Sequence, residues 1–426
     1  MVATLIPLFE ADMTVGSYSV LARKENHLLD GSFAGYGRYD GAGNVSELDV
    51  VNSMGVEALA GEGTVFVPIN NISIFSDISS VCKVPLEKII LLMDNTIPPT
   101  EQYVNRIKEL KEEGFSFGIR KLQMGDFLAY QEILKMTSYL FLNRENPDLE
   151  KSRQLLRVKY RNLKLCAVNV NTYDEKEELD KRGKFDLYEG KFFRIPIVDS
   201  DHEVNPLKVN YVRLFNTVNA PDFNLEDAAD VIGEDTALVI SLLEMVNKMT
   251  VNSGIKSVRH ATAMLGQKEL RRWIDTALAK ELCADKPSEI TRMSMIRARF
   301  AENLAPEFEL ANLSQELFLM GMFSLIDVML NKPMEEAIKI LNVSSHISDA
   351  LINNSGLFYP VYALASAYEQ ADWDEVSRII VLKNLNSENI YNAYLGALSW
   401  YRDLVRETAE TEKIKEDIKA EAEASN

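Results

Sequence analysis

The chain has 426 residues, of which 46% are hydrophobic, and its formal net charge at pH 7 is −18. A chain of this length and composition is expected to fold into two or three domains with ordinary hydrophobic cores. The excess of acidic residues would repel nucleic-acid phosphates and anionic membrane surfaces, so we expect no nucleic-acid partner.

Three features of the sequence predict a cytoplasmic protein without a membrane span. The amino-terminal residues MVATLIPLFEAD contain no basic segment and reach acidic residues at Glu10 and Asp12, unlike a secretory signal. The longest apolar run, residues 317–326, is too short to cross a bilayer. The cysteines are far apart and lie among apolar neighbours, as expected of core residues in a reducing compartment; they are Cys82, Cys166 and Cys283.

The first half of the chain alternates strand-like and helix-like segments. Strand-like apolar runs occupy residues 4–9, 16–22, 64–69, 88–93, 115–119, 138–142 and 164–170. Amphipathic helical stretches occupy residues 100–113 and 147–160. Continuous apolar strands joined by helices indicate parallel strands that are buried on both faces. We therefore predict an α/β domain, a TIM-barrel-like fold somewhat short of eight full units, with function at the carboxyl ends of its strands.

A glycine-rich stretch, GSFAGYGRYDGAG, lies at residues 31–43 within this half. Glycines let backbone amides approach an anion closely, so a phosphate-binding loop is one interpretation. The stretch contains GxG but neither GxGxxG nor a Gly-Lys-Ser/Thr ending, and no clear buried strand precedes it. A surface loop is the favoured interpretation, because Gly, Asp and Asn at this density are typical of turns.

Seven segments of the first half follow one another in a characteristic order: YSVLAR, FVPINN, IILLMDN, GFSFGIRKL, YLFLN, AVNVNTYDEKEEL and LYEGKFFRIP. Their spacing and apolar pattern, more than their identities, resemble the EAL family of cyclic di-GMP phosphodiesterases, in the short form that precedes an HDOD domain. The resemblance covers residues 1–200. It implies a barrel whose strand ends hold two divalent metals, and hydrolysis of a phosphodiester with these metals needs several carboxylates.

Most of those carboxylates are missing when the resemblance is followed residue by residue. The glutamate of the EAL motif falls on Ser19, and the metal-binding asparagine falls on Asn70 or Asn71. The next acidic position falls near Leu92 or Asp94.

The later positions of the family's site are changed more strongly. Its paired aspartates fall on Arg120 and Lys121, and the lysine and aspartate of the next strand fall on Phe141 and Asn143. The last glutamate falls on Asn171, while Glu189 replaces a glutamine before Gly190. Two cations in place of the metal ligands would repel Mg²⁺ by several kcal/mol, so we predict a catalytically inactive barrel without a metal site or cofactor.

Two interpretations of Arg120 and Lys121 remain open. Cations at the mouth of a barrel could bind a phosphate without hydrolysing it, and Asn70 and Asn171 would then be further ligand-binding candidates. Alternatively, they are solvated residues of a loop that no longer holds metals, and this interpretation is favoured because most surface charges are simply solvated.

The second half of the chain has helical periodicity only, after a proline-containing joint at residues 194–206. One stretch, residues 234–273, places apolar residues on one helix face: Leu238, Leu242, Met245, Val246 and Met249. Gly266 is predicted to end the following helix before Gln267 begins another. The charged residues 405–426 contain no aromatic side chain and are predicted to extend the last helix or to be disordered.

Within this stretch, EDTAL, LLEMVNK, SVRHATAMLG and ELRRW resemble the HDOD family, whose relatives include HD-domain phosphohydrolases. The resemblance covers residues 204–404 and implies an all-helical domain. An HD hydrolase needs a His-Asp pair with further ligands to hold its metals. The sequence contains no His-Asp dipeptide, and its four histidines, His27, His202, His260 and His346, are isolated. We expect none to bind a metal, with His260 packed or hydrogen-bonded within its helix.

The sequence therefore predicts a non-catalytic signal-transduction protein that acts through protein–protein contacts. Two alternatives remain: a receptor for cyclic di-GMP or another nucleotide, and a phosphodiesterase that uses a rearranged metal site. A homo-oligomer is compatible with either. The partner and the pathway do not follow from the sequence.

Overall fold

The computed structural model describes residues 2–23, 45–196, 214–215, 217–218, 223–234, 236–249, 255, 257–282, 288–341 and 343–424. The glycine-rich stretch at residues 31–43 lies outside these ranges, as do His27, Cys283 and most of the predicted joint. Within the described part of the chain, no helix is long and apolar enough to cross a membrane.

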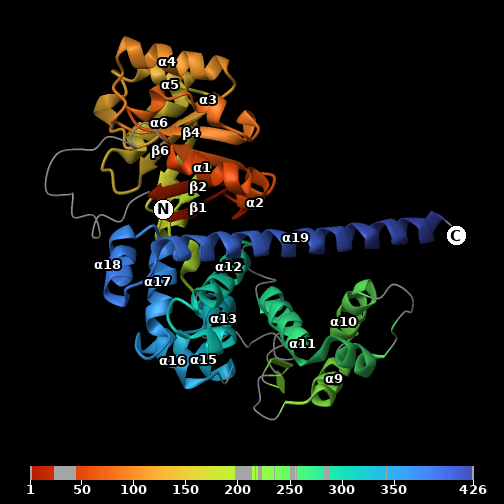
Figure 1. The fold of residues 1–426 in the computed structure, drawn as a ribbon. Helices are drawn as coiled ribbons and strands as arrows, with labels where there is room; N and C mark the ends of the chain where they lie inside the picture. Colours follow the sequence, from red (N-terminus) through yellow and green to blue (C-terminus); the bar gives the residue numbers. More distant parts are fainter. Residues whose placement is uncertain are drawn as a thin grey trace. The chain divides into compact units, whose positions relative to one another are not determined.

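The first half forms a closed barrel in which neighbouring strands follow chain order. Figure 1 shows its ribbon, with β1, β2, β4 and β6 labelled. The strands are β1 (Val2–Phe9), β2 (Val15–Arg23), β3 (Thr64–Pro68), β4 (Ile89–Met93), β5 (Ser116–Ile119), β6 (Tyr139–Asn143), β7 (Lys164–Val168) and β8 (Leu187–Glu189). Strand β1 is antiparallel to its neighbours β2 and β8, and the other neighbouring pairs are parallel. The predicted TIM-barrel-like fold is confirmed, with eight strands rather than fewer.

Helices connect the parallel strands, as the alternating pattern predicts. They are α1 (Ser46–Met54), α2 (Val56–Ala60), α3 (Ile78–Val81), α4 (Glu101–Glu112), α5 (Gln131–Met136), α6 (Leu149–Lys159) and α7 (Tyr173–Arg182). Helix α7 begins with a capping box. Thr172 Oγ1 accepts a hydrogen bond from the backbone amide of Glu175, and the Glu175 carboxylate accepts one from the backbone amide of Thr172. This cap fixes Glu175 next to the carboxyl end of β7.

The inside of the barrel is filled by side chains from most of its strands. A buried apolar cluster comprises Leu8, Phe66, Ile90, Leu92, Phe141, Cys166, Val168 and Leu187. Gly118 leaves room for this filling, since a Cβ there would lie 3.1 Å from Leu92 Cδ1 and 3.3 Å from Phe66 Cε1. The barrel interior is therefore a packed core.

The second half is helical throughout its described residues, which confirms the predicted class. Its helices are α9 (Leu225–Gly233), α10 (Thr236–Met249), α11 (Val258–Leu282), α12 (Ser288–Leu304), α13 (Ser314–Phe323), α14 (Ile326–Leu330), α15 (Met334–Leu341), α16 (Ser345–Ile352), α17 (Tyr359–Glu369), α18 (Trp373–Lys383) and α19 (Ser387–Ala424). Of the predicted apolar face, Leu238, Leu242 and Val246 are buried in one cluster, whereas Met245 is only partly buried. Gly266 interrupts α11 with φ 72°, as predicted. His260, predicted to be packed or hydrogen-bonded within its helix, is exposed on α11 and therefore not packed.

The chain folds into two compact units whose boundaries are not sequential. The first unit comprises residues 1–195, 299–314 and 363–426, and the second comprises residues 196–298 and 315–362. Helices α12 and α17 each begin in the second unit and end in the first. The carboxyl-terminal helices α18 and α19 therefore belong with the barrel, although they follow the helical half in the sequence.

Candidate functional site

The polar residues singled out in the first half gather at one rim of the barrel. Because β2 to β8 run parallel, their carboxyl ends meet at the same edge. This rim receives Asn70 after β3, Asp94 after β4, Arg120 with Lys121 after β5, Asn143 at the end of β6, Asn169 with Asn171 after β7, and Glu189 at the end of β8.

The centre of the rim is an ion pair between Arg120 and Glu189. Arg120 Nη2 lies 3.1 Å from Glu189 Oε1, and the two side chains are only 24% and 16% exposed. The Arg120 guanidinium lies over the ring of buried Phe141, 5.5 Å from its centroid. Glu189 Oε2 is buried and makes no hydrogen bond within the described part of the chain. Arg120, which falls on a metal-binding aspartate of the EAL family, thus places a cation at this rim and pairs it with Glu189.

Lys121 makes a second ion pair at the same rim. Its Nζ lies 2.8 Å from Asp94 Oδ2, while Asp94 Oδ1 accepts hydrogen bonds from the Thr96 amide and hydroxyl at 2.9 Å and 2.6 Å. Lys121 has φ 65°, a left-handed conformation that is uncommon outside glycine and often occurs at functional sites. Burial alone would raise the pKa of Asp94, but the hydrogen bonds from Lys121 and Thr96 outweigh it and hold the pKa below its usual value.

Replacing Lys121 with methionine is expected to raise the pKa of Asp94, because burial of the carboxyl remains while its cation is lost. In the wild type, the lowered pKa of Asp94 stabilises the fold at pH values above 3.8, the pKa of the carboxyl in the unfolded chain. This stability disappears as the pH falls through the lower pKa that Asp94 has in the folded protein. The difference in unfolding free energy should be below about 1 kcal/mol at pH 7, because Lys121 is 62% exposed. Chemical denaturation of the wild type and the variant at pH 7 and pH 3 measures this difference. If the difference in unfolding free energy is the same at both pH values, Lys121 does not stabilise the charged form of Asp94.

The position of the EAL-motif glutamate lies deeper in the barrel. Ser19 is fully buried, pairs in register with Ile6 and Phe66, and its hydroxyl has no hydrogen-bond partner among the described residues. Cys166 is also fully buried, and burial raises the pKa of its thiol well above the usual range. The neutral hydroxyl of Ser19 cannot replace the carboxylate of the EAL motif as a ligand of Mg²⁺.

Asn70 supports a turn at the end of β3. Its Oδ1 accepts hydrogen bonds from the backbone amides of Ile72 and Ser73 at 2.8 Å and 2.9 Å. The backbone amide of Asn70 donates to Ser73 Oγ. An asparagine that bonds the amides two and three residues ahead is typical of a turn. Its side-chain oxygen is therefore already engaged, while its role in ligand binding stays a prediction.

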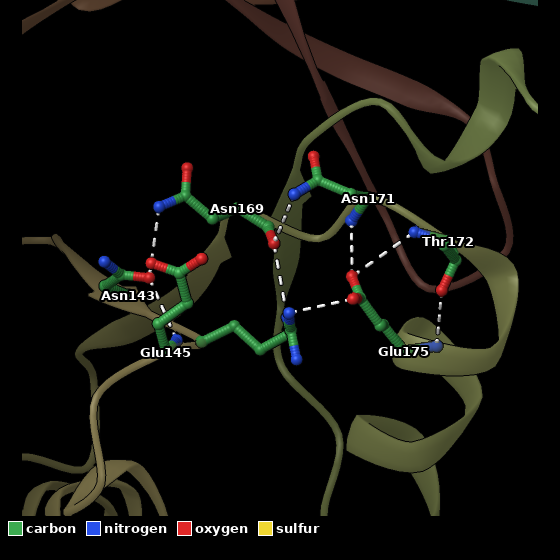
Figure 2. Close-up of polar contacts among 7 residues, drawn as sticks. Asn143, Glu145, Asn169, Asn171, Thr172 and Glu175 are labelled. Carbon is green, nitrogen blue, oxygen red and sulfur yellow. Dashed lines mark hydrogen bonds and ion pairs between the residues drawn. The ribbon is translucent and has the colours of Figure 1, made fainter.

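Asparagines link the carboxyl ends of β6 and β7 (Figure 2). Asn143 Oδ1 accepts hydrogen bonds from Asn169 Nδ2 at 3.1 Å and from the Glu145 amide at 3.0 Å. Asn169 has φ 63°, and its carbonyl accepts Asn171 Nδ2 at 3.3 Å. Two of the sequence-predicted positions, Asn143 and Asn171, are thereby brought into one network through Asn169, which no sequence signal had indicated.

Glu175 attaches this network to helix α7 (Figure 2). Its Oε2 accepts the Asn171 amide at 2.7 Å, and its Oε1 pairs with Arg144 Nη2 at 2.8 Å. Arg144 Nε also donates to the Asn169 carbonyl at 3.3 Å. The Glu175 carboxylate thus bonds the backbone after β7, at Asn171, and the side chain of Arg144, which directly follows β6. The positive charge of Arg144 balances the negative charge of the carboxylate.

The donors at this rim do not fit a pair of divalent metals. The described residues contain no group of three or more His, Cys, Asp or Glu side chains that could hold a metal ion. Asp94 and Glu189 are each bonded to a cation, and Arg120 and Lys121 stand where metal-binding carboxylates were expected. The structure brings Arg120, Lys121, Asn143 and Asn171 to one rim, but it engages each of them in internal bonds.

Comparisons with known proteins support the predicted architecture. Residues 205–350 match the HDOD domain family, which confirms the HDOD domain in the second half. The chain is 28% identical over 416 residues to the uncharacterised protein YuxH of Bacillus subtilis, covering 94% of this chain and 97% of that protein. It is 26% identical over 330 residues to the cyclic di-GMP phosphodiesterase CdgJ of Vibrio cholerae, covering 76% of this chain and 75% of that protein.

Solved EAL domains are similar to part of the chain. One is a standalone EAL protein from Vibrio cholerae in its cyclic di-GMP-bound form, with 15% identity, a TM-score of 0.34 and coverage of 45% of this chain and 90% of that chain. Another is the EAL domain of FimX from Pseudomonas aeruginosa bound to cyclic di-GMP, with 13% identity, a TM-score of 0.33 and coverage of 45% and 88%.

Proposed function

We propose that this chain is a non-catalytic signal-transduction protein in which a barrel resembling a cyclic di-GMP phosphodiesterase and an HDOD domain act through protein–protein contacts. The observation that carries the proposal is the Arg120–Glu189 ion pair above Phe141. In a two-metal site, the metal ions stabilise the attacking and leaving oxygens and lower the pKa of a water. A guanidinium can attract a phosphate, but it cannot generate a hydroxide at neutral pH.

The charges at the rim argue against a metal more strongly than the loss of any one ligand. A divalent ion near Arg120 and Lys121 would meet two positive charges, and each of these already neutralises a carboxylate. Breaking a partly buried ion pair to admit a metal would also leave one charge without a partner. Both effects oppose metal binding, which supports an inactive barrel.

The helical half supports a role in contacts rather than in hydrolysis. The sequence lacks the His-Asp dipeptide of HD hydrolases, and His260 is exposed on α11. His346 contacts Phe358 with its ring and lies 3.7 Å from Glu316, without a second histidine among its described neighbours. A helical frame whose described residues form no metal-ligating group is suited to presenting a surface to a partner.

A receptor for cyclic di-GMP is the second candidate, and the position of Arg120 at the rim favours it. Arg120 retains two features of an anion-binding residue, since it lies at the rim and stacks on an aromatic ring. Binding would require its guanidinium to contact a phosphate in addition to Glu189. The similarity to CdgJ, by its name a phosphodiesterase, makes retained hydrolysis the third outcome to test.

One experiment separates the three candidates. The full chain is titrated with cyclic di-GMP by calorimetry, with and without Mg²⁺ or Mn²⁺, and the products are then analysed. The proposal predicts no metal-dependent product, binding without product would establish the receptor, and chelator-sensitive turnover would refute the proposal.

A further inference from the structure

The barrel has a seam between β1 and β8 that the two strands close only in part. Strand β1 pairs with β2 along its whole length, from Val2 to Phe9. Its ladder with β8 consists of the single pair Phe9–Tyr188, and β8 ends one residue later at Glu189. The remaining edge of β1 therefore needs other partners, because unpaired strand edges leave backbone groups without hydrogen bonds.

Two buried tyrosines from the carboxyl-terminal helices bond residues of β1, one at a backbone amide and one at a side-chain hydroxyl. The Ala3 amide donates to the Tyr368 hydroxyl at 3.1 Å, and the hydroxyls of Thr4 and Tyr394 lie 3.2 Å apart. Tyr368, on α17, is 0% exposed, and Tyr394, on α19, is 4% exposed. The Tyr368 hydroxyl thus takes the place that a β8 carbonyl would have in a complete ladder.

The same helices also hold the other side of the seam. Lys191, two residues after β8, donates from Nζ to Gln370 Oε1 at 2.6 Å, and Gln370 directly follows α17. The end of α17 is therefore bonded on one side to β1, through Tyr368, and on the other side to the chain that leaves β8. Helix α19 also contacts β1 and α2.

An aromatic cluster fixes the two tyrosines in place. The ring centroids of Tyr368 and Tyr394 lie 4.8 Å apart, and the ring of Phe300 lies 5.2 Å from each. Trp373 of α18 packs edge-on against Tyr368 at 5.5 Å. Such pairs add to the free energy gained by burial, and together they make residues from α12, α17, α18 and α19 one packed body.

We propose that residues 363–405, here called the strap, form a releasable wall of the barrel, which closes the β1–β8 seam and opens as a unit while β3 to β7 stay folded. The strap lies outside the residues that match the HDOD domain, and it is held to β1 by few hydrogen bonds compared with the ladders inside the sheet. Its release would uncover the edge of β1 at Ala3 and Thr4. This inference concerns the construction of the barrel and does not depend on whether the barrel is catalytic.

Hydrogen exchange of the full chain tests the strap. The double variant Tyr368→Phe and Tyr394→Phe keeps both rings and removes both hydroxyls, so the fold is retained while the Ala3 amide loses its partner. We expect amides in peptides that cover β1 to exchange about tenfold faster than in the wild type, while those of β4 and β6 change by less than about twofold.

Tyr130→Phe is the matched control. Tyr130 is also buried and donates its hydroxyl to the Ile97 carbonyl at 3.0 Å, away from the seam. This variant should leave β1 exchange at the wild-type rate. Unchanged β1 exchange in the double variant, an equal acceleration of β1, β4 and β6, or an equal effect of Tyr130→Phe on β1 would each overturn the proposal.

Discussion

Replacing Arg120 with alanine is expected to lower the free energy of unfolding of the barrel by about 2–3 kcal/mol. The change removes the cation from Glu189, whose Oε2 already lacks a hydrogen bond within the described residues, and it uncovers the ring of Phe141. The value lies below that of a fully buried pair because both side chains keep some contact with water. Chemical denaturation followed by circular dichroism measures the effect.

Two further variants make this test specific. Glu189→Gln should lower the free energy of unfolding by less than Arg120→Ala does, because Arg120 would keep its contact with Phe141 and its access to water. The change Lys121→Ala should lower the free energy of unfolding by less than about 1 kcal/mol, because the Lys121 side chain is 62% exposed. A double-mutant cycle that finds no coupling between positions 120 and 189 would show that the ion pair is not part of the barrel's stable structure.

The substitution Gly190→Ala is expected to destabilise the barrel by about 3 kcal/mol or to prevent its folding. A Cβ at this position would lie 2.5 Å from the carbonyl carbon of Val170 and closer still to its oxygen. The backbone cannot easily move away, because the Val170 amide donates to the Glu189 carbonyl and the Phe192 amide donates to the Val170 carbonyl. Relieving the clash must separate the ends of β7 and β8, which also moves Glu189 away from Arg120.

Gly125→Ala is the control for this prediction. A Cβ at Gly125 meets nothing within 4 Å, so the change should alter the unfolding free energy by less than about 0.5 kcal/mol. Thermal or chemical unfolding of the two variants beside the wild type gives the comparison. Equal stability of the two variants would mean that the carboxyl ends of β7 and β8 do not pack as the structure shows.

Hydrophobic patterning was sufficient to predict most of the barrel. Seven of its strands lie where apolar runs predicted them, because buried parallel strands have few polar residues. Strand β8 was missed as a strand because it has three residues, Leu187 to Glu189, too few to form a pattern. The closing role of α17 and α19 was also beyond sequence reasoning, since Tyr368 and Tyr394 meet residues more than 360 positions away.

The candidate site was predictable in its residues but not in its bonds. The resemblance placed Arg120, Lys121 and Asn171 at the strand ends, and the structure brings them to one rim. The pairing of Arg120 with Glu189 joins residues 69 positions apart, at the ends of strands β5 and β8, which are not neighbours in the sheet, so no local pattern could indicate it. Burial of Glu189 and its position opposite Arg120 depend on closure of the whole barrel.

Product analysis of cyclic di-GMP incubated with the full chain tests the central claim most directly. The reactions contain Mg²⁺ or Mn²⁺ or a chelator, and CdgJ, named as a cyclic di-GMP phosphodiesterase, serves as the positive control. We predict that the dinucleotide is recovered intact from this chain in every reaction. Linear product that forms with metal, disappears with chelator and is lost on replacing Asn70 or Asp94 would contradict the account.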